Sequence, residues 1–315
     1  MRRPRAGDMP LSFLSPTPEK SKYSGLRVFP GFARDGQGGA IRDLRGLPAS
    51  LGRIGSLELR LATRRGEIRK AQKLRYRVFF QQGGAIADMR SRMTRRDICP
   101  FDRICDHLLV VDHDFVSRLG RRKPKIVGAY RLLRQDVASR HGGFYSAQEF
   151  DVAPLLARHP DKKFLEMGRS CVHEKWRNKR TLELMWRGIW TYVRHHDMDV
   201  LIGCASLPGA DAGRHAASLA FLHQHAAADA EWAVEPLSRD RLEIQELAAP
   251  VDARRAFAAL PPLLKGYLRC GARVSASAVI DRMFGTTDVF AVMPIADIDK
   301  RYIEHFGGAG ERAAA

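Results

Sequence analysis

The side chains best suited to chemistry are concentrated in one stretch, residues 164–181, with the sequence FLEMGRSCVHEKWRNKRT. Its first half is apolar apart from Glu166. A carboxylate in such a setting has a partner or a raised pKa, and a raised pKa is what a general base for an ammonium nucleophile needs. We therefore take Glu166 as the candidate general base, with Arg169 in the same catalytic group. The alternative is a buried acid that is structurally paired with Arg169.

The second half of this stretch is a basic turn that leads into a helix. The start of a helix offers unpaired backbone N–H groups and the positive end of the helix dipole to an anion. A phosphopantetheine phosphate or a coenzyme A pyrophosphate would suit such a turn, whereas no GxxxxGK[ST] sequence indicates a P-loop. An ordinary solvated turn is the alternative. The candidate donor-binding residues are Lys175, Arg177, Asn178, Lys179, Arg180 and Thr181.

These side chains need a scaffold, and the hydrophobic pattern predicts an α/β one. Alternating or short apolar runs predict strands, and apolar residues three and four apart predict helices. The expected strands are residues 57–61, 107–111, 125–133, 164–172, 200–205, 243–247 and 287–294, and the expected helices are 65–80, 181–195, 214–227 and 262–270. Antiparallel strands next to strand–helix–strand crossovers give a central mixed, twisted sheet with helices on both faces.

The periodic part of the chain covers residues 56–298, which we expect to form one domain. Residues 1–55 are rich in Pro, Gly and Ser, and Arg and Lys outnumber Asp and Glu there by 10 to 4, which indicates a flexible basic extension. Residues 299–315 are expected to form a disordered tail. The polar residues 83–106 are long for a plain connection and are therefore a candidate functional loop.

The formal net charge of the chain is +18. Such a charge implies a polyanionic partner, which could be a nucleic acid, an anionic membrane surface or an acidic protein. Charge alone does not choose among these three, and it is also compatible with a basic surface that only meets solvent.

Five cysteines, none of them in a CxxC pair, argue against a disulfide scaffold or a structural zinc site and favour a reducing, cytoplasmic compartment. Cys171 lacks an obvious His and Asp partner, so we expect a buried structural thiol there. The histidines form no HExxH pattern, and no metal site is expected. Without a long apolar run, we expect neither a transmembrane helix nor a secretory signal.

Four motifs occur in order along the chain. They are LRYRVFF at residues 74–80, FDRICDHLLVVD at 101–112, VGAYRLL at 127–133 and EMGRSCVHEKWRN at 166–178. Together with residues 261–294, they resemble the ornithine Nα-acyltransferase family of bacterial ornithine-lipid biosynthesis, which is related to acyl-homoserine-lactone synthases. The resemblance covers residues 57–297.

This resemblance implies a GNAT-like (acyl-CoA N-acyltransferase) three-layer fold and an acyl-carrier-protein thioester, commonly 3-hydroxyacyl, as the donor. The acceptor would be the α-amine of L-ornithine, and the product a lyso-ornithine lipid. The acyl-phosphopantetheine thioester would be a co-substrate, and no separate cofactor is expected. Acyl carrier proteins are acidic, so the basic charge would steer the donor. The expected docking residues are Arg118, Arg121, Arg122 and Lys123, or the 175–180 turn. A lipid product also implies peripheral contact with the anionic inner membrane.

The resemblance also assigns roles to single residues. Arg75 and Phe79 match an R-x-x-V-F motif that shapes the acceptor and acyl-binding face, Asp102 and Asp106 match an acidic loop, Arg131 matches a central-strand arginine, and Glu166 and Arg169 match an E-x-G-R motif. In this scheme the two aspartates hold the ammonium groups of ornithine, and Arg131 or Arg169 binds its carboxylate. A backbone N–H within residues 168–171 would stabilise the oxyanion.

Three other functions stay open at this point. One is an acyl-homoserine-lactone synthase that uses S-adenosylmethionine, although such synthases are usually shorter and the motif at residues 261–294 fits the lipid enzymes better. A second is an acyltransferase for glycine or another amino acid. The third is a basic nucleic-acid-binding protein, which no zinc-finger, RRM or KH signature supports.

Overall fold

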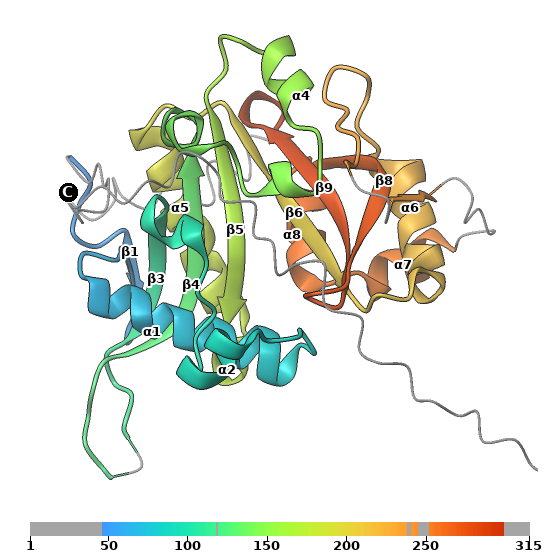
Figure 1. Ribbon diagram of the computed structural model, residues 1–315. Coiled ribbons are helices and arrows are strands. Elements are labelled where there is room, and N and C mark those ends of the chain that lie inside the picture. The colour runs from blue at the N-terminus through green and yellow to red at the C-terminus, as the bar shows by residue number, and fades with distance from the viewer. Residues whose placement is uncertain (1–45, 118, 238–240, 245–251, 299–315) are drawn as a thin grey trace, which may run out of the picture.

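Strands from both halves of the chain meet in a single mixed sheet in the computed structural model (Figure 1), which describes residues 46–117, 119–237, 241–244 and 252–298. The described residues form nine strands in the order β1-β2-β3-β4-β5-β6-β9-β8-β7. They are β1 (Gly52–Ile54), β2 (Leu57–Leu61), β3 (Asp106–Asp112), β4 (Lys125–Arg134), β5 (Phe164–Val172), β6 (Val200–Pro208), β7 (Arg241–Glu243), β8 (Arg273–Asp281) and β9 (Thr286–Pro294). The β5–β6 pair is parallel and all other neighbours are antiparallel.

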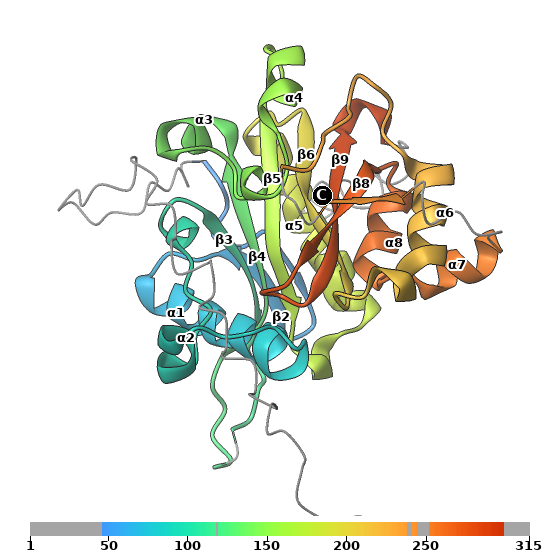
Figure 2. The same cartoon turned by 45° about the vertical axis from the view of Figure 1, so that its right-hand side comes forward.

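Helices cover both faces of this sheet, as the pattern predicted (Figures 1 and 2). On one face lie α1 (Arg65–Arg75), its π-helical continuation Tyr76–Gln82, α2 (Met89–Thr94), α3 (Gln135–Ala138) and α4 (Ala153–Arg158). The opposite face is covered by α5 (Lys179–His195), α6 (Ala216–Ala226), α7 (Ala253–Ala259) and α8 (Pro262–Arg269). We call these the α1 face and the α5 face. Short 3-10 turns include Pro100–Arg103, Ser146–Gln148 and Glu174–Trp176.

The α5 face holds the largest hydrophobic core. Helix α5 places Leu184, Trp190 and Tyr192 among its buried residues, which follows from its strong apolar stripe. Gly188 lets the helix approach the sheet closely, because a Cβ there would lie 1.9 Å from Leu59 Cδ2. This packing fixes α5, and with it the turn that precedes the helix, against the sheet.

Strands β5 and β6 pair over only three residues, from Phe164↔Val200 to Glu166↔Ile202. Beyond them, β5 continues along β4 and β6 continues along β9. At the point of parting, Gly203 lies against the backbone of β5, and a Cβ there would sit 2.4 Å from the Met167 carbonyl oxygen. The two strands therefore separate in the middle of the sheet.

A β-bulge in β5 lies directly beyond this point. Arg131 of β4 is opposite Gly168, whereas Ala129 is opposite Cys171, so β5 carries one extra residue. Arg169 takes up that residue with a positive φ of 52°. This bulge turns the Arg169 side chain toward the α1 face, where it meets Asp97.

Several sequence boundaries need correction. Residues 52–54 form β1 within the sheet, so the ordered domain begins before residue 56. The expected helix 65–80 becomes π-helical from Tyr76. Strand β8 was missed because its Ser and Ala residues give little hydrophobic alternation. The strand expected at 243–247 is found at Arg241–Glu243, and residues 1–45, 245–247 and 299–315 lie outside the described residues. Within the described ranges, no helix combines the length and apolar character needed to cross a bilayer.

Substitution of Gly203 by Ala should lower the free energy of unfolding by about 1–3 kcal/mol, because the added methyl group overlaps the Met167 carbonyl. Urea denaturation would measure the change. Gly66→Ala in α1 is the matched control, since no atom lies within 4 Å of its added methyl group, and its stability should be unchanged or slightly raised. Equal stability of the wild type and Gly203→Ala would show that the strands do not need this contact.

Candidate active site

The parting of β5 and β6 exposes backbone groups in the centre of the sheet. Beyond Glu166, the edge of β5 that faces β6 pairs with no strand among the described residues. Backbone N–H groups on that edge are therefore available to a ligand. An oxyanion donor within residues 168–171 was predicted from the sequence, and it stays a prediction.

A buried network of charges supports this region from the α1 face. Arg75 of α1 is 1% exposed and lies at its centre. Its Nε donates to Asp97 Oδ2 at 2.8 Å, and its Nη2 donates to Asp102 Oδ2 at 2.8 Å. Gln72 and the backbone N–H of Cys99 also donate to Asp102. Arg75 therefore joins α1 to the 83–106 loop, which was a candidate functional loop on its length and polarity.

Both aspartates of this network also face arginines of the sheet. Arg131 Nη1 lies 3.5 Å from Asp102 Oδ1, and Arg169 Nε lies 3.4 Å from Asp97 Oδ2. Burial alone would raise the pKa of Asp102, but the Arg75 and Arg131 guanidiniums hold it well below its usual range. The network therefore stays charged and fixes Arg169 on the bulge. Asp97 was not singled out in the sequence, because nothing separates it from the other charged residues of its loop.

Glu166 lies at the last pair before the strands part, and it is 4% exposed. Its two carboxylate oxygens accept hydrogen bonds from the backbone N–H groups of Tyr145 and Ser146, at 2.8 and 2.7 Å. These contacts make Glu166 an anchor for the loop at Tyr145. Each carboxylate oxygen keeps a second lone pair, so the role of Glu166 as general base, directly or through a water, stays a prediction. The alternative ion pair with Arg169 is wrong, since Arg169 faces Asp97.

The two aspartates predicted to share ornithine's ammonium groups are not brought together. Asp102 is bound to Arg75 of α1, on the α1 face. Asp106 accepts a hydrogen bond from the Tyr192 hydroxyl of α5, at 2.7 Å, on the opposite face. Asp102 is also neutralised by two guanidiniums. The prediction of a joint ammonium site at these positions is therefore corrected.

Phe79 lies near Arg169 through an aromatic contact that the sequence did not indicate. The Phe79 ring meets Phe284, from the β8–β9 turn, edge to face with centroids 6.0 Å apart. Phe284 in turn lies 4.3 Å from the Arg169 guanidinium carbon. The same guanidinium covers the Tyr145 ring at 4.5 Å and donates to its hydroxyl at 3.0 Å. Arg169 thus contacts two aromatic rings from separate segments, and Phe79 packs against one of them.

An acidic cluster lies beside this guanidinium and was missed in the sequence. Glu149, Asp281 and Asp288 each place a carboxylate oxygen within 4.8 Å of the other two. Burial, together with the facing carboxylates, raises the pKa values of Glu149 and Asp288. Such a group can hold a cation, whether an ammonium group or a metal ion. Glu149 is more than 130 residues away from its partners, so no local spacing could have revealed the cluster.

The predicted donor turn follows the free end of β5. Asn178 caps α5 by accepting a hydrogen bond from the Thr181 backbone N–H at 3.1 Å. Lys175, Lys179 and Arg180 are exposed and surround the first turn of the helix. Thr181 is 1% exposed and its hydroxyl donates to the Asn178 side chain, so its place in the phosphate-binding set is corrected to a capping role.

The basic β3–β4 hairpin lies next to this turn. Phe115 of the hairpin contacts Trp176 of the turn, with centroids 6.1 Å apart, and Lys125 lies over both rings. Arg121, Arg122 and Lys123 in the hairpin are exposed, whereas Arg118 lies outside the described residues. The two regions predicted as alternative docking sites are therefore parts of one basic edge.

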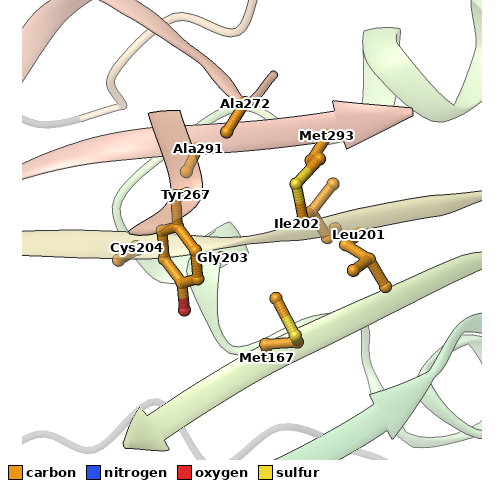
Figure 3. Close-up of a pocket in the computed structure, with 9 residues that line it drawn as sticks. All are labelled: Met167, Leu201, Ile202, Gly203, Cys204, Tyr267, Ala272, Ala291 and Met293. Atoms are coloured by element: carbon orange, nitrogen blue, oxygen red, sulfur yellow. The ribbon is translucent and has the colours of Figure 1, made fainter. Parts of the chain in front are cut away.

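A small apolar cavity of about 10 Å³ occupies the space between the parting strands and α8 (Figure 3). Its lining includes Met167 of β5, Leu201 of β6, Met293 of β9 and Tyr267 of α8. The Tyr267 hydroxyl is hydrogen bonded to that of Tyr130. Methionine side chains adapt their shape readily, so the lining of this cavity, which has room for about one water molecule, is deformable.

Substitution of Asp102 by Asn should lower the free energy of unfolding by about 3–5 kcal/mol, because it leaves Arg75 and Arg131 without their shared carboxylate. Urea denaturation at neutral pH would measure it. The folded pKa lies below the unfolded one, so the stabilisation is complete above about pH 3.9 and is lost as the pH falls further. The difference from wild type should therefore shrink in acid.

Asp136→Asn is the control for this substitution, since Asp136 pairs with Arg134 and Arg140 at the surface. Its stability should stay within about 1 kcal/mol of wild type. An equally small effect of Asp102→Asn would contradict the structural importance of the network.

Comparison with known proteins places these features in a family. Residues 74–187, from the end of α1 into α5, match the acetyltransferase (GNAT) domain. The chain is similar in fold to an N-acyl amino acid synthase from uncultured soil microbes, with a TM-score of 0.43, 10% identity and coverage of 76% of this chain and 92% of that one.

Relatives in two named bacteria are closer in sequence. The L-ornithine N(alpha)-acyltransferase of Agrobacterium fabrum is 48% identical over 264 residues, which cover 83% of this chain and 88% of the relative. The enzyme of the same name from Rhizobium meliloti is 48% identical over 277 residues, which cover 86% and 92%. The chain therefore belongs to the L-ornithine N(alpha)-acyltransferase family and is an N-acyltransferase with a GNAT fold.

Proposed function

We propose that this enzyme transfers a (3-hydroxy)acyl group from acyl carrier protein to the α-amine of L-ornithine, which gives a lyso-ornithine lipid and begins ornithine-lipid biosynthesis. The observation that carries the proposal is the parting of β5 and β6 between a basic edge and an acidic cluster. An acidic donor binds best to a positively charged surface, and a dicationic acceptor binds best to a negatively charged one. The basic edge and the acidic cluster on the two sides of this opening provide these charges. The names of the relatives support ornithine as the acceptor.

The donor side is the basic edge formed by the β3–β4 hairpin and the turn before α5. The phosphate of phosphopantetheine would bind at the first turn of α5, with Lys175, Lys179 and Arg180 around it. The acidic surface of the carrier protein would meet the exposed hairpin side chains Arg121 and Arg122. From this edge, the thioester arm would follow the open edge of β5 to the bulge.

The acceptor side begins at Arg169. Its side chain is 12% exposed, whereas those of Arg75 and Arg131 are 1% and 3% exposed, so Arg169 is the guanidinium of the network that a substrate can reach. We assign the ornithine carboxylate to Arg169. The adjacent carboxylates Glu149 and Asp281 attract the ammonium groups.

The chemistry at the bulge is acyl transfer. The uncharged amine attacks the thioester carbonyl, backbone N–H groups of β5 stabilise the oxyanion, and the phosphopantetheine thiolate leaves. The acyl chain would extend into the apolar cavity between the strands and α8. The product carries an acyl chain on a charged head group. We therefore propose that the enzyme works in the cytoplasm with peripheral contact to the inner membrane.

Purified full-length protein, given a 3-hydroxyacyl carrier protein, should acylate L-ornithine at the α-amine in preference to glycine or S-adenosylmethionine. Mass spectrometry of the products would identify the acylated amine. Acylation of S-adenosylmethionine alone would establish the lactone-synthase alternative, and acylation of glycine alone would change the acceptor. Failure with all three amines would refute the proposal.

Charge reversal by Lys175→Glu should raise the KM for the acyl carrier protein roughly tenfold at low salt and should flatten the dependence of kcat/KM on ionic strength. The KM for ornithine should change little, because Lys175 is at the donor turn. Lys162→Glu reverses an equally exposed charge before the opposite end of β5 and is the matched control. A similar effect of both substitutions would exclude a specific docking role for the turn.

A further inference from the structure

Three carboxylates of separate origin face one another on the α1 face of the sheet. Glu149 comes from the loop before α4, Asp281 from the end of β8, and Asp288 from β9. Their oxygens lie within 4.8 Å of one another, where ionised carboxylates repel unless a cation or a shared proton lies between them. Asp281 Oδ1 also accepts hydrogen bonds from the backbone N–H groups of Met283 and Phe284. The nearest guanidinium, that of Arg169, faces Asp97 and donates to the Tyr145 hydroxyl.

Asp288 provides a second, independent indication that the cluster binds a hydrogen-bond donor. It is 5% exposed, and its buried Oδ1 accepts no hydrogen bond from the described residues. Burial raises the pKa of this carboxyl group, while hydrogen bonding by the Thr286 and Ser206 hydroxyls lowers it. A buried carboxylate oxygen without a donor is costly, since it loses its hydration and gains no bond in return. A ligand with N–H groups would provide the bond.

The three carboxylates lie at different distances along the sheet from the bulge. Glu149 Oε2 accepts a weak hydrogen bond from Cys204 Sγ at 3.6 Å. Cys204 follows Gly203, the residue that touches β5 where the strands part. Asp288 is one strand further away, on β9, and Asp281 is on β8, beyond β9. Glu149 is therefore the carboxylate of the cluster that contacts the part of β6 where β5 and β6 separate.

We propose that this cluster binds both ammonium groups of ornithine, with Glu149 as the base for the α-ammonium and Asp281 and Asp288 as the site of the side-chain ammonium. The inference rests on the proposed function and deepens it. It replaces Glu166 as the base with a carboxylate that no backbone N–H occupies among the described residues, and it makes Asp288 a determinant of acceptor specificity.

The proton balance of the reaction is complete with Glu149. Glu149 takes one proton from the α-ammonium, and the uncharged nitrogen then attacks the thioester carbonyl carbon. The C–N bond forms, the C–S bond breaks, and the second nitrogen proton ends on the departing thiolate. Glu149 then releases its proton to water. No oxidant, reductant or further reactant is needed.

The surroundings of Glu149 suit this task. The facing titratable and charged groups are Asp281, Asp288, Cys204, Arg169 and Tyr145. Burial and the two aspartates raise the pKa of Glu149, whereas Arg169 lowers it. A raised carboxyl pKa reduces the mismatch with an amine, so the proton transfer becomes easier.

The test compares ornithine with L-norvaline, which has the same carbon chain without the side-chain amine. Wild-type protein should prefer ornithine by about 100-fold or more in kcat/KM, because norvaline leaves buried carboxylates unpaired. Asp288→Asn should lower kcat/KM for ornithine by about 10–100-fold, mainly through KM, and should change that for norvaline by less than about threefold. The ratio of kcat/KM for ornithine to that for norvaline should therefore be much smaller in Asp288→Asn than in the wild type.

Glu149→Gln should lower kcat for both amines by about 100-fold or more, the effect expected for loss of a general base. Its activity should rise steadily with pH, as the free amine replaces the missing base. Asp161→Asn, which removes an exposed acid before the opposite end of β5, is the control. Thermal melts would confirm that each variant folds, and Asp281→Asn, at a less buried position, should reproduce the specificity change if Asp288→Asn fails to fold.

Three results would overturn the assignment. The first is an equal loss of kcat/KM for ornithine and for norvaline in Asp288→Asn, and the second is a normal kcat in Glu149→Gln. The third is loss of wild-type activity in EDTA with recovery in Mg²⁺, which would make the cluster a metal site. Failure of the wild type to acylate ornithine would instead refute the proposed function, and this assignment with it.

Discussion

An alternating chain of buried charges, Arg131–Asp102–Arg75–Asp97–Arg169, holds the centre of the molecule together. It joins α1 to β4 and to the bulge of β5 through Asp97 and Asp102 of the 83–106 loop. Removal of any one member would leave a buried charge without its partner, which costs far more than loss of an exposed pair. Arg169, the residue on the β5 bulge, places its side chain in the site because this chain of charges holds the guanidinium there.

The network and the acidic cluster are electrostatic complements. The network has three guanidiniums and two carboxylates, so one positive charge is left over, and Arg169 carries it to the border of the cluster. The Arg169 charge lowers the pKa values of Glu149 and Asp288. Burial and the repulsion among the carboxylates raise these pKa values by more than Arg169 lowers them, so both lie above their ordinary values. The cluster therefore takes up a proton or binds a cation more readily than isolated carboxylates do. An amino acid with a carboxylate and two ammonium groups satisfies both parts.

In the proposed reaction, the two substrates approach from different sides and meet at the parting of β5 and β6. The donor turn and the basic hairpin lie where β5 ends, and the cluster lies on the α1 face beside Arg169. A positive edge for the carrier protein and a negative site for the amine would weaken each other if they were mixed. Their separation by the central strands lets each keep its own sign.

The sequence determined the strands and helices of regular pattern, the GNAT family and the basic turn, because local periodicity and contiguous motifs carry that information. It could not assign side chains whose role depends on a distant partner. Glu166 looked like a free base, yet loop amides occupy it, and Asp102 and Asp106 are close in sequence but face opposite sides of the sheet. Only the tertiary structure decided where the acids meet, because register and crossovers, not sequence spacing, place Glu149 beside the β8–β9 hairpin.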